Sequence, residues 1–100
     1  MPVSKKHYRE LYELIAALKG TKETELLLTD MLTPQELDTI AERWQEIQLL
    51  AKGLPQRTIA EKLGISISKI TRGSRVLQHG NGAFVKMLKK LKKPVAKQYR

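Results

Sequence analysis

The sequence of 100 residues contains no cysteine, which excludes disulfide bonds and thiolate metal sites and suits a reducing compartment. No apolar run approaches the roughly 18 residues of a membrane span, and the N-terminal segment lacks the apolar core of a signal peptide. His7 and His79 have no partners at metal-ligand spacing. We therefore expect a soluble cytoplasmic protein without a metal or a resident cofactor.

Acidic residues are absent after Glu61, although the chain as a whole has a net charge of +9. Residues 1–61 hold 8 Lys and Arg against 10 Asp and Glu, a net −2, whereas residues 62–100 hold 11 Lys and Arg, a net +11. A purely cationic half repels itself unless a polyanion is nearby. Nucleic acid is the first candidate partner, and an anionic membrane surface is the second.

Catalytic constellations are also lacking. The sequence has no GxSxG, no P-loop and no cysteine nucleophile, and its acids fall on helix faces expected to be exposed. An enzyme is therefore the weakest of three function classes. A nucleic-acid-binding protein comes first, and a basic membrane-surface protein is the alternative, because "AFVKMLKKLKK" has the amphipathic form of a surface helix. We favour a dimer-packing role with a solvated lysine face for that helix.

Helical spacing of apolar residues runs through nearly the whole chain, which predicts an all-α fold. "LYELIAALKG" and "TKETELLLTDML" each indicate a helix. "LTPQEL" then provides a capping box between Thr33 and Glu36, with Pro34 at the first helical position. It opens a long helix ending near Gly53, suited to the spine of a dimer, whose apolar side carries Leu37, Ile40, Trp44, Ile47 and Leu50. We interpret Trp44 as a core residue.

Two short helices around Gly64, roughly Pro55–Leu63 and Ser66–Gln78, have the spacing of a helix-turn-helix. The small Ala60 is followed four residues later by the glycine, and Ile70 lies six residues after it. A helical hairpin with a solvated basic face is the alternative. Hydroxyls, amides and cations remain on the outside, where they can reach bases and phosphates in a major groove. They are Gln56, Arg57, Ser66, Ser68, Lys69, Thr71, Arg72 and Arg75.

"LTP", Arg43, "PQR.IAEKLG" and above all "ITRGS" (Ile70–Ser74) resemble the bacterial Trp repressor family, over roughly Leu11 to Leu91. The resemblance implies an intertwined, all-helical homodimer that binds a palindromic operator, with L-tryptophan as corepressor. It places Gln56 and Arg57 at the start of the first motif helix, in contact with DNA. The positions it assigns to the recognition helix are Ile67, Ser68, Thr71, Arg72 and Arg75.

The resemblance also implies a corepressor pocket between the spine helix and the recognition helix. Two arginines sandwich the indole there, while a threonine and backbone carbonyls hold the amino-acid end, and planar guanidinium groups suit both stacking and carboxylate binding. The matching residues are Leu32, Thr33, Arg43, Arg72 and Gly73. Val76 stands where familiar members have a serine that meets the amino group. A ligand-independent or differently liganded regulator is therefore the alternative to a tryptophan-responsive one.

Two further expectations concern single residues and boundaries. Without the family resemblance, Arg43 would be interpreted as a surface cation paired with Glu42 or Glu46. The domain is expected to span residues 1–93, with the helix-turn-helix at about 55–78, and residues 94–100 to form a basic disordered tail.

Overall fold

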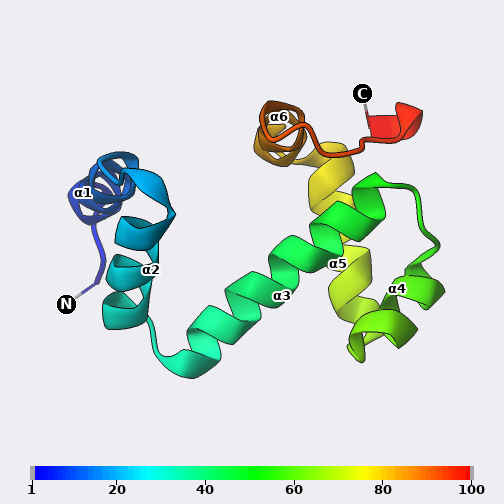
Figure 1. Ribbon diagram of the computed structural model, residues 1–100, viewed down its shortest axis with the longest axis horizontal. Coiled ribbons are helices and arrows are strands. Elements are labelled where there is room, and N and C mark those ends of the chain that lie inside the picture. Colours follow the sequence, from blue (N-terminus) through cyan, green and yellow to red (C-terminus); the bar gives the residue numbers. More distant parts are fainter. Residues whose placement is uncertain (1, 100) are drawn as a thin grey trace. The chain divides into compact units, whose positions relative to one another are not determined.

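The computed structural model describes residues 2–99, which form helices and, within that range, no strand (Figure 1). The elements are α1 (Lys5–Ala16), α2 (Gly20–Met31), α3 (Pro34–Ala51), α4 (Gln56–Leu63), α5 (Ile67–His79), α6 (Ala83–Lys90) and the 3-10 helix η1 (Lys97–Tyr99). The all-α class predicted from apolar spacing is confirmed. Across residues 2–99, no helix combines the length and apolar character needed to cross a bilayer.

The chain divides into two compact units, and the boundary falls inside α3 between Leu37 and Asp38. The first unit contains α1 and α2, both wholly within the described residues, and neither helix buries a residue. Large apolar side chains of α1 and α2 are exposed to solvent: Tyr8 is 51% exposed, Ile15 42% and Leu26 56%. This unit therefore leaves uncovered the apolar stripes that normally drive helix packing.

A capping box opens α3, as the sequence predicts. The backbone N–H of Thr33 donates to Glu36 Oε1 at 2.8 Å, and Thr33 Oγ1 accepts from the Glu36 N–H at 3.1 Å. The hydrogen bond from the Thr33 backbone, and then the one with its side chain, lower the pKa of the Glu36 carboxyl. The box satisfies two amide donors that the start of a helix leaves unpaired, so it fixes where α3 begins.

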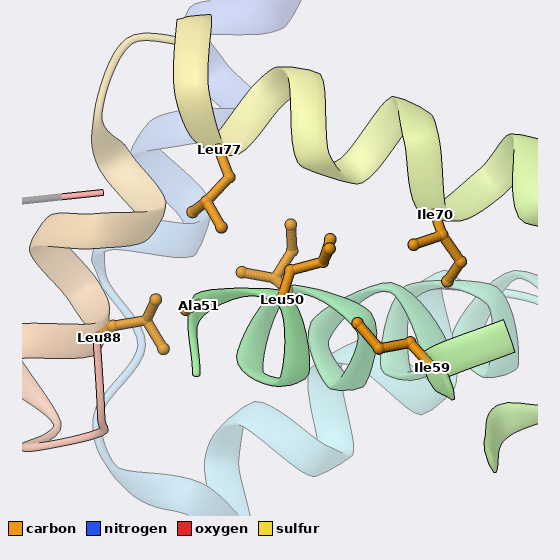
Figure 2. Packing of buried hydrophobic residues seen from close by; sticks show 7 residues of the cluster. Leu50, Ala51, Ile59, Ile70, Leu77 and Leu88 are labelled. Carbon is orange, nitrogen blue, oxygen red and sulfur yellow. The ribbon is translucent and has the colours of Figure 1, made fainter. Parts of the chain in front are cut away.

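The second unit has a hydrophobic core to which four helices contribute. Figure 2 shows the buried side chains of α3 facing those of α4, α5 and α6. They are Ile47, Leu50, Ala51, Ile59, Ile70, Leu77 and Leu88. At Gly73 the two long helices come close, because a Cβ added there would lie 3.2 Å from Leu50 Cδ1. The missing side chain thus lets α5 pack directly on α3.

The turn between α4 and α5 has the conformation that the helix-turn-helix pattern requires. Gly64 ends α4 in the left-handed region, at φ 65 and ψ 36. Ile70 is fully buried, and the half-buried Ile65 packs against the same core. The Oγ of Ser66 accepts a hydrogen bond from the Lys69 N–H and caps α5. The bounds predicted for the two helices of this motif agree with the structure to within one residue at each end.

Replacing Gly64 with alanine should lower the free energy of unfolding by about 1–2 kcal/mol, the cost of holding an L-residue in the left-handed region. A Cβ at Gly64 would meet nothing within 4 Å, so the loss comes from the backbone conformation and not from a clash. Gly64→Asn should lose less, because asparagine tolerates this region better. Denaturant unfolding measures both, and equal losses for the two variants would contradict the explanation.

Residues 95–99 pack on the core instead of extending as the disordered tail expected from the sequence. Val95 and Tyr99 lie against the core, and the Ala96 N–H donates to the Ala51 carbonyl at 2.6 Å. That carbonyl is at the end of α3, where helix carbonyls lack partners within the helix. The segment is held on the core because Val95 and Tyr99 contact its apolar surface and the Ala96 N–H donates to a carbonyl there.

Candidate functional site

The outer face of α5 carries hydroxyl and cationic side chains. Ser68, Arg72 and Arg75 are exposed and follow one another at helical spacing. The opposite face is buried, with Ile70 and Leu77 in the core. Because the helix is anchored by its inner face, it presents these polar groups in a fixed arrangement. No acidic residue occurs on α5, so nothing on the helix itself repels a polyanion.

A side-chain contact joins the first motif helix to the second. The Thr71 hydroxyl lies 2.9 Å from Gln56 Oε1 and 3.0 Å from the Ile67 carbonyl, and its single hydrogen is donated to one or shared between them. The bond with Gln56 orients the amide so that its NH₂ group remains to donate elsewhere. Arg57, the next residue on α4, is exposed. The predicted contact residues of α4 and α5 are therefore brought together.

The start of α5 is a cluster of small polar groups. Ser66 Oγ lies 3.4 Å from the Lys69 amide nitrogen, which donates to it, and 3.1 Å from Ser68 Oγ. Ile67, the first residue of the helix, is 49% exposed. Amides in the first turn of a helix lack partners within it and attract anions. Ser66, Ile67 and Ser68 are thus gathered and exposed at the start of α5, and their contact with DNA stays a prediction.

Lys69 differs from the other predicted contact residues, because its side chain pairs with α3. Lys69 Nζ lies 3.5 Å from Glu42 Oε1. Glu42 thereby pairs with a lysine from α5 and not with Arg43, its neighbour on α3. This ion pair is partly exposed, so its contribution to stability is small. It does hold the lysine at the edge of a pocket between the two helices.

Two residues that the sequence analysis missed complete the polar surface. Gln78 and His79 are exposed and share a shallow depression with Gln56, Thr71, Ser74 and Arg75. The signal that could have found them is spacing, since His79 lies four residues after Arg75 and eight after Thr71. The polar surface therefore continues to the end of α5.

A pocket of about 400 Å³ lies between α3, α5 and the start of α6. Its lining residues are Thr39, Glu42, Arg43, Glu46, Ile47, Lys69, Arg72, Gly73, Val76 and Phe84. The structure thus brings Arg43, Arg72 and Gly73 together at one pocket, and their contact with an effector stays a prediction. Leu32 and Thr33 belong to the first unit. There the Thr33 hydroxyl oxygen accepts the capping hydrogen bond from the Glu36 N–H.

Glu46 is the lining residue least expected in a pocket of this kind. Its side chain is only 5% exposed, and its Oε1 has no hydrogen-bond partner among the described residues. Burial, and then the nearby charge of Glu42, raise the pKa of the Glu46 carboxyl, while Lys69 and Arg43 act in the opposite direction. The sequence signal was available: Thr39, Glu42 or Arg43, and Glu46 recur at spacings of three and four on one face of α3.

Trp44 packs against the core, as predicted, and it also supports the pocket. Its ring stacks on that of Phe84, with centroids 6.1 Å apart and planes inclined by 26°. Both rings pack against the core cluster, and Phe84 in addition lines the pocket. An offset aromatic pair of this kind is worth about 0.5–1.5 kcal/mol beyond the area it buries. The stack therefore ties the start of α6 to α3 beside the pocket.

The buried carboxyl of Glu46 should make the stability of the protein depend on pH. Because the folded state raises the pKa of Glu46 above its ordinary 4.5, the wild type is penalised at neutral pH and regains stability as the pH falls toward that value. Glu46→Gln should therefore be more stable than wild type at neutral pH, by roughly 1–3 kcal/mol. The difference should vanish in acid. The lowered pKa of Glu36 affects the stability of both proteins equally, so it does not contribute to the difference between them. Thermal unfolding across pH tests this, and a pH-independent difference would contradict it.

The chain is similar to proteins of one family. Residues 6–92 match the family described as Trp repressor protein. A Trp operon repressor homolog of Vibrio parahaemolyticus is 37% identical over 90 residues, covering 89% of this chain and 87% of the relative. One of Mannheimia succiniciproducens is 44% identical over 75 residues, covering 74% and 73%.

Solved structures show the same likeness in three dimensions. The crystal structure of a candidate Trp repressor from Staphylococcus aureus has a TM-score of 0.85 and 26% identity, with 93% of each chain covered. A TrpR-like protein from Eubacterium eligens has a TM-score of 0.83 and 25% identity, with 93% of this chain and 95% of the other covered. The all-α arrangement described above is therefore the fold of these proteins.

Proposed function

Since the chain belongs to the Trp repressor family, one of transcriptional regulators, we propose that it is a sequence-specific DNA-binding repressor acting as a homodimer in the cytoplasm. The observation that carries the proposal is the outer face of α5. Its exposed hydroxyls and cations project from a helix whose other side is anchored in the core, and no acid interrupts them.

In this proposal α5 enters the major groove. Its first turn, with Ser66 and Ser68, meets a phosphate through free amides. Arg57 and Arg75 contact phosphates or base edges from the two motif helices, and Gln56 donates through the amide that Thr71 orients. Ordered water carries much of the base recognition in the known Trp repressor–operator complex, so direct base contacts are expected to be few here as well.

The homodimer is supported by the exposed apolar side chains of α1, α2 and the first half of α3. No residue of α1 or α2, helices that lie wholly within the described range, is buried, and Ile40 on α3 is 45% exposed. A second copy would cover these stripes by exchanging helices, which makes folding and assembly inseparable. Two recognition helices would then meet half-sites one DNA turn apart. That spacing is about 34–36 Å in helix-turn-helix dimers, the Trp repressor among them.

L-Tryptophan is the first effector to test. Arg43 and Arg72 line the pocket between α3 and α5, where Gly73 lets the two helices come close. A ligand bound there would favour the DNA-competent position of α5, and coupling of this kind changes affinity roughly 5–150-fold. The Thr33 hydroxyl and the Leu32 carbonyl are proposed to hold the amino-acid end. Val76 and Glu46 favour the second candidate, a regulator that responds to another ligand or to none.

Selection of bound sequences from random DNA, with and without L-tryptophan, tests the proposal. We expect a palindromic site to be enriched, and enrichment only with the amino acid would establish it as corepressor. Equal enrichment without it would favour the second candidate. Failure to enrich any sequence, together with binding to anionic vesicles that is lost on deleting residues 84–93, would instead establish a membrane-surface protein.

A further inference from the structure

Glu46 is a buried acid whose Oε1 lacks a partner. The side chain is 95% buried and lines the pocket, and no hydrogen bond to that oxygen is found within residues 2–99. Buried polar groups in native proteins are almost always paired, because an unpaired carboxylate loses its hydration without compensation. The described residues therefore supply no hydrogen-bond donor to Glu46 Oε1.

The charged groups that face Glu46 are arranged so that none of them pairs with it. From α3 come Glu42 and Arg43, and from α5 come Lys69 and Arg72. Lys69 Nζ is held by Glu42 at 3.5 Å, on the partly exposed side of the pocket. Arg43 and Arg72 are exposed. The pocket lining contains two acids, Glu42 and Glu46. Glu42 pairs with Lys69, so Glu46 is the acid that has no cationic partner among the described residues and is removed from solvent.

We propose that the pocket takes a small aromatic amine, whose protonated nitrogen pairs with Glu46 and whose ring lies against the apolar part of the lining. The inference rests on the proposed function only in naming the class of effector. A carboxylate on the ligand is not required, because the distinctive polar group of this pocket is an acid. This chemistry separates the ligand from an amino acid recognised by its carboxylate.

The remaining lining suits an aromatic ring. Phe84, Ile47 and Val76 supply apolar surface, and the guanidinium groups of Arg43 and Arg72 can stack on a ring. A volume of about 400 Å³ lies within the usual range of sites for small organic molecules. An ammonium that pairs with Glu46 gains a charge-assisted hydrogen bond to a side chain that is only 5% exposed, and such bonds are strongest away from solvent.

Calorimetry on the full chain without DNA tests the inference with three probes that share an indole ring. Tryptamine carries an ammonium group alone, indole-3-propionate a carboxylate alone, and L-tryptophan both. At neutral pH we expect tryptamine to bind at least as tightly as L-tryptophan and about tenfold or more tighter than indole-3-propionate. Absence of tryptamine binding, or tighter binding of indole-3-propionate, would overturn the proposal.

Variants at Glu46 then assign the contact. Glu46→Gln should weaken tryptamine about 10–100-fold, the worth of a hydrogen bond to a charged group, and leave indole-3-propionate unweakened. Glu46→Asp keeps the charge and should retain part of the affinity, which separates recognition from misfolding. Glu61→Gln makes the same change on α4, outside the pocket, and should have no effect. If Glu46→Gln, shown by circular dichroism to be folded, binds tryptamine as wild type does, the assignment is wrong.

The pH dependence gives a second readout. Protonation of Glu46 removes its charge while the amine of tryptamine stays protonated, so wild-type affinity should fall as the pH decreases through the raised pKa. The Glu46→Gln variant should show no such fall. Because these experiments omit DNA, their failure leaves the DNA-binding proposal intact. Failure of the DNA selection would likewise leave the ligand measurements valid.

Discussion

Ile15→Asp is expected to convert the protein from a dimer to a poorly folded monomer at micromolar concentration and to weaken operator binding by about 100-fold or more. Ile15 lies on the uncovered apolar stripe of α1 and is 42% exposed in the single chain. In the proposed dimer a second copy covers it, so an aspartate there would bury an unpaired charge. A monomer also loses the gain from two linked half-site contacts, which is roughly 10²–10⁴-fold.

Light scattering and operator titration measure the two effects, and Ala16→Asp is the matched control. It adds the same charge one residue later, off the stripe defined by Leu11 and Ile15, and should leave the protein dimeric. If light scattering shows that the wild-type protein is a stable, folded monomer, the proposed intertwined dimer is wrong. An Ile15→Asp variant that remains dimeric, with unchanged affinity for the operator, would contradict it as well.

Arg75→Ala is expected to weaken operator binding roughly 5–150-fold, because each well-placed contact to a base edge is worth about 1–3 kcal/mol. Arg75 is exposed on the outer face of α5, beside the surface formed by Gln56 and Thr71. Arg57→Ala, at the start of α4, should act on phosphate. It should weaken all DNA sequences alike and flatten the salt dependence of binding by about one counterion.

Lys22 provides the control for charge alone. It lies on α2, where its ammonium is 3.6 Å from Glu25 Oε1, and it is not among the proposed contacts. Lys22→Ala should leave operator affinity nearly unchanged. Lys69→Ala should weaken operator binding more than Lys22→Ala and less than Arg75→Ala, since Lys69 pairs with Glu42. If Arg57→Ala and Arg75→Ala both bind as wild type does across salt concentrations, the docking face has been misassigned.

Features that depend on neighbouring residues could be predicted from the sequence. The capping box of Thr33 and Glu36 is a contact three residues apart, and it forms as expected. The turn at Gly64 needs a positive φ, which glycine adopts at little cost, and the spacing from Ala60 to Ile70 then fixes which side of α5 is buried. Local geometry decides these features, so the pattern contains enough information.

Features that depend on packing between distant segments could not be predicted in the same way. Glu46 is next to Ile47 on a helix whose acids were expected to be exposed, and only the approach of α5 and α6 buries it. Tyr99 belongs to a segment, residues 94–100, whose proline and cationic residues indicate disorder, yet it packs against the core. In both cases the composition of the segment is outweighed by an apolar surface that another part of the chain provides.

The stack of Trp44 on Phe84 gives the protein an optical reporter of its own. Trp44 is the single tryptophan in the sequence, and the ring it stacks on lines the pocket. Its fluorescence should change when a ligand displaces Phe84 or shifts α6 against α3. 2-Phenylethylamine absorbs at shorter wavelengths than indole, so binding of this aromatic amine can be followed without a label and without emission from the ligand.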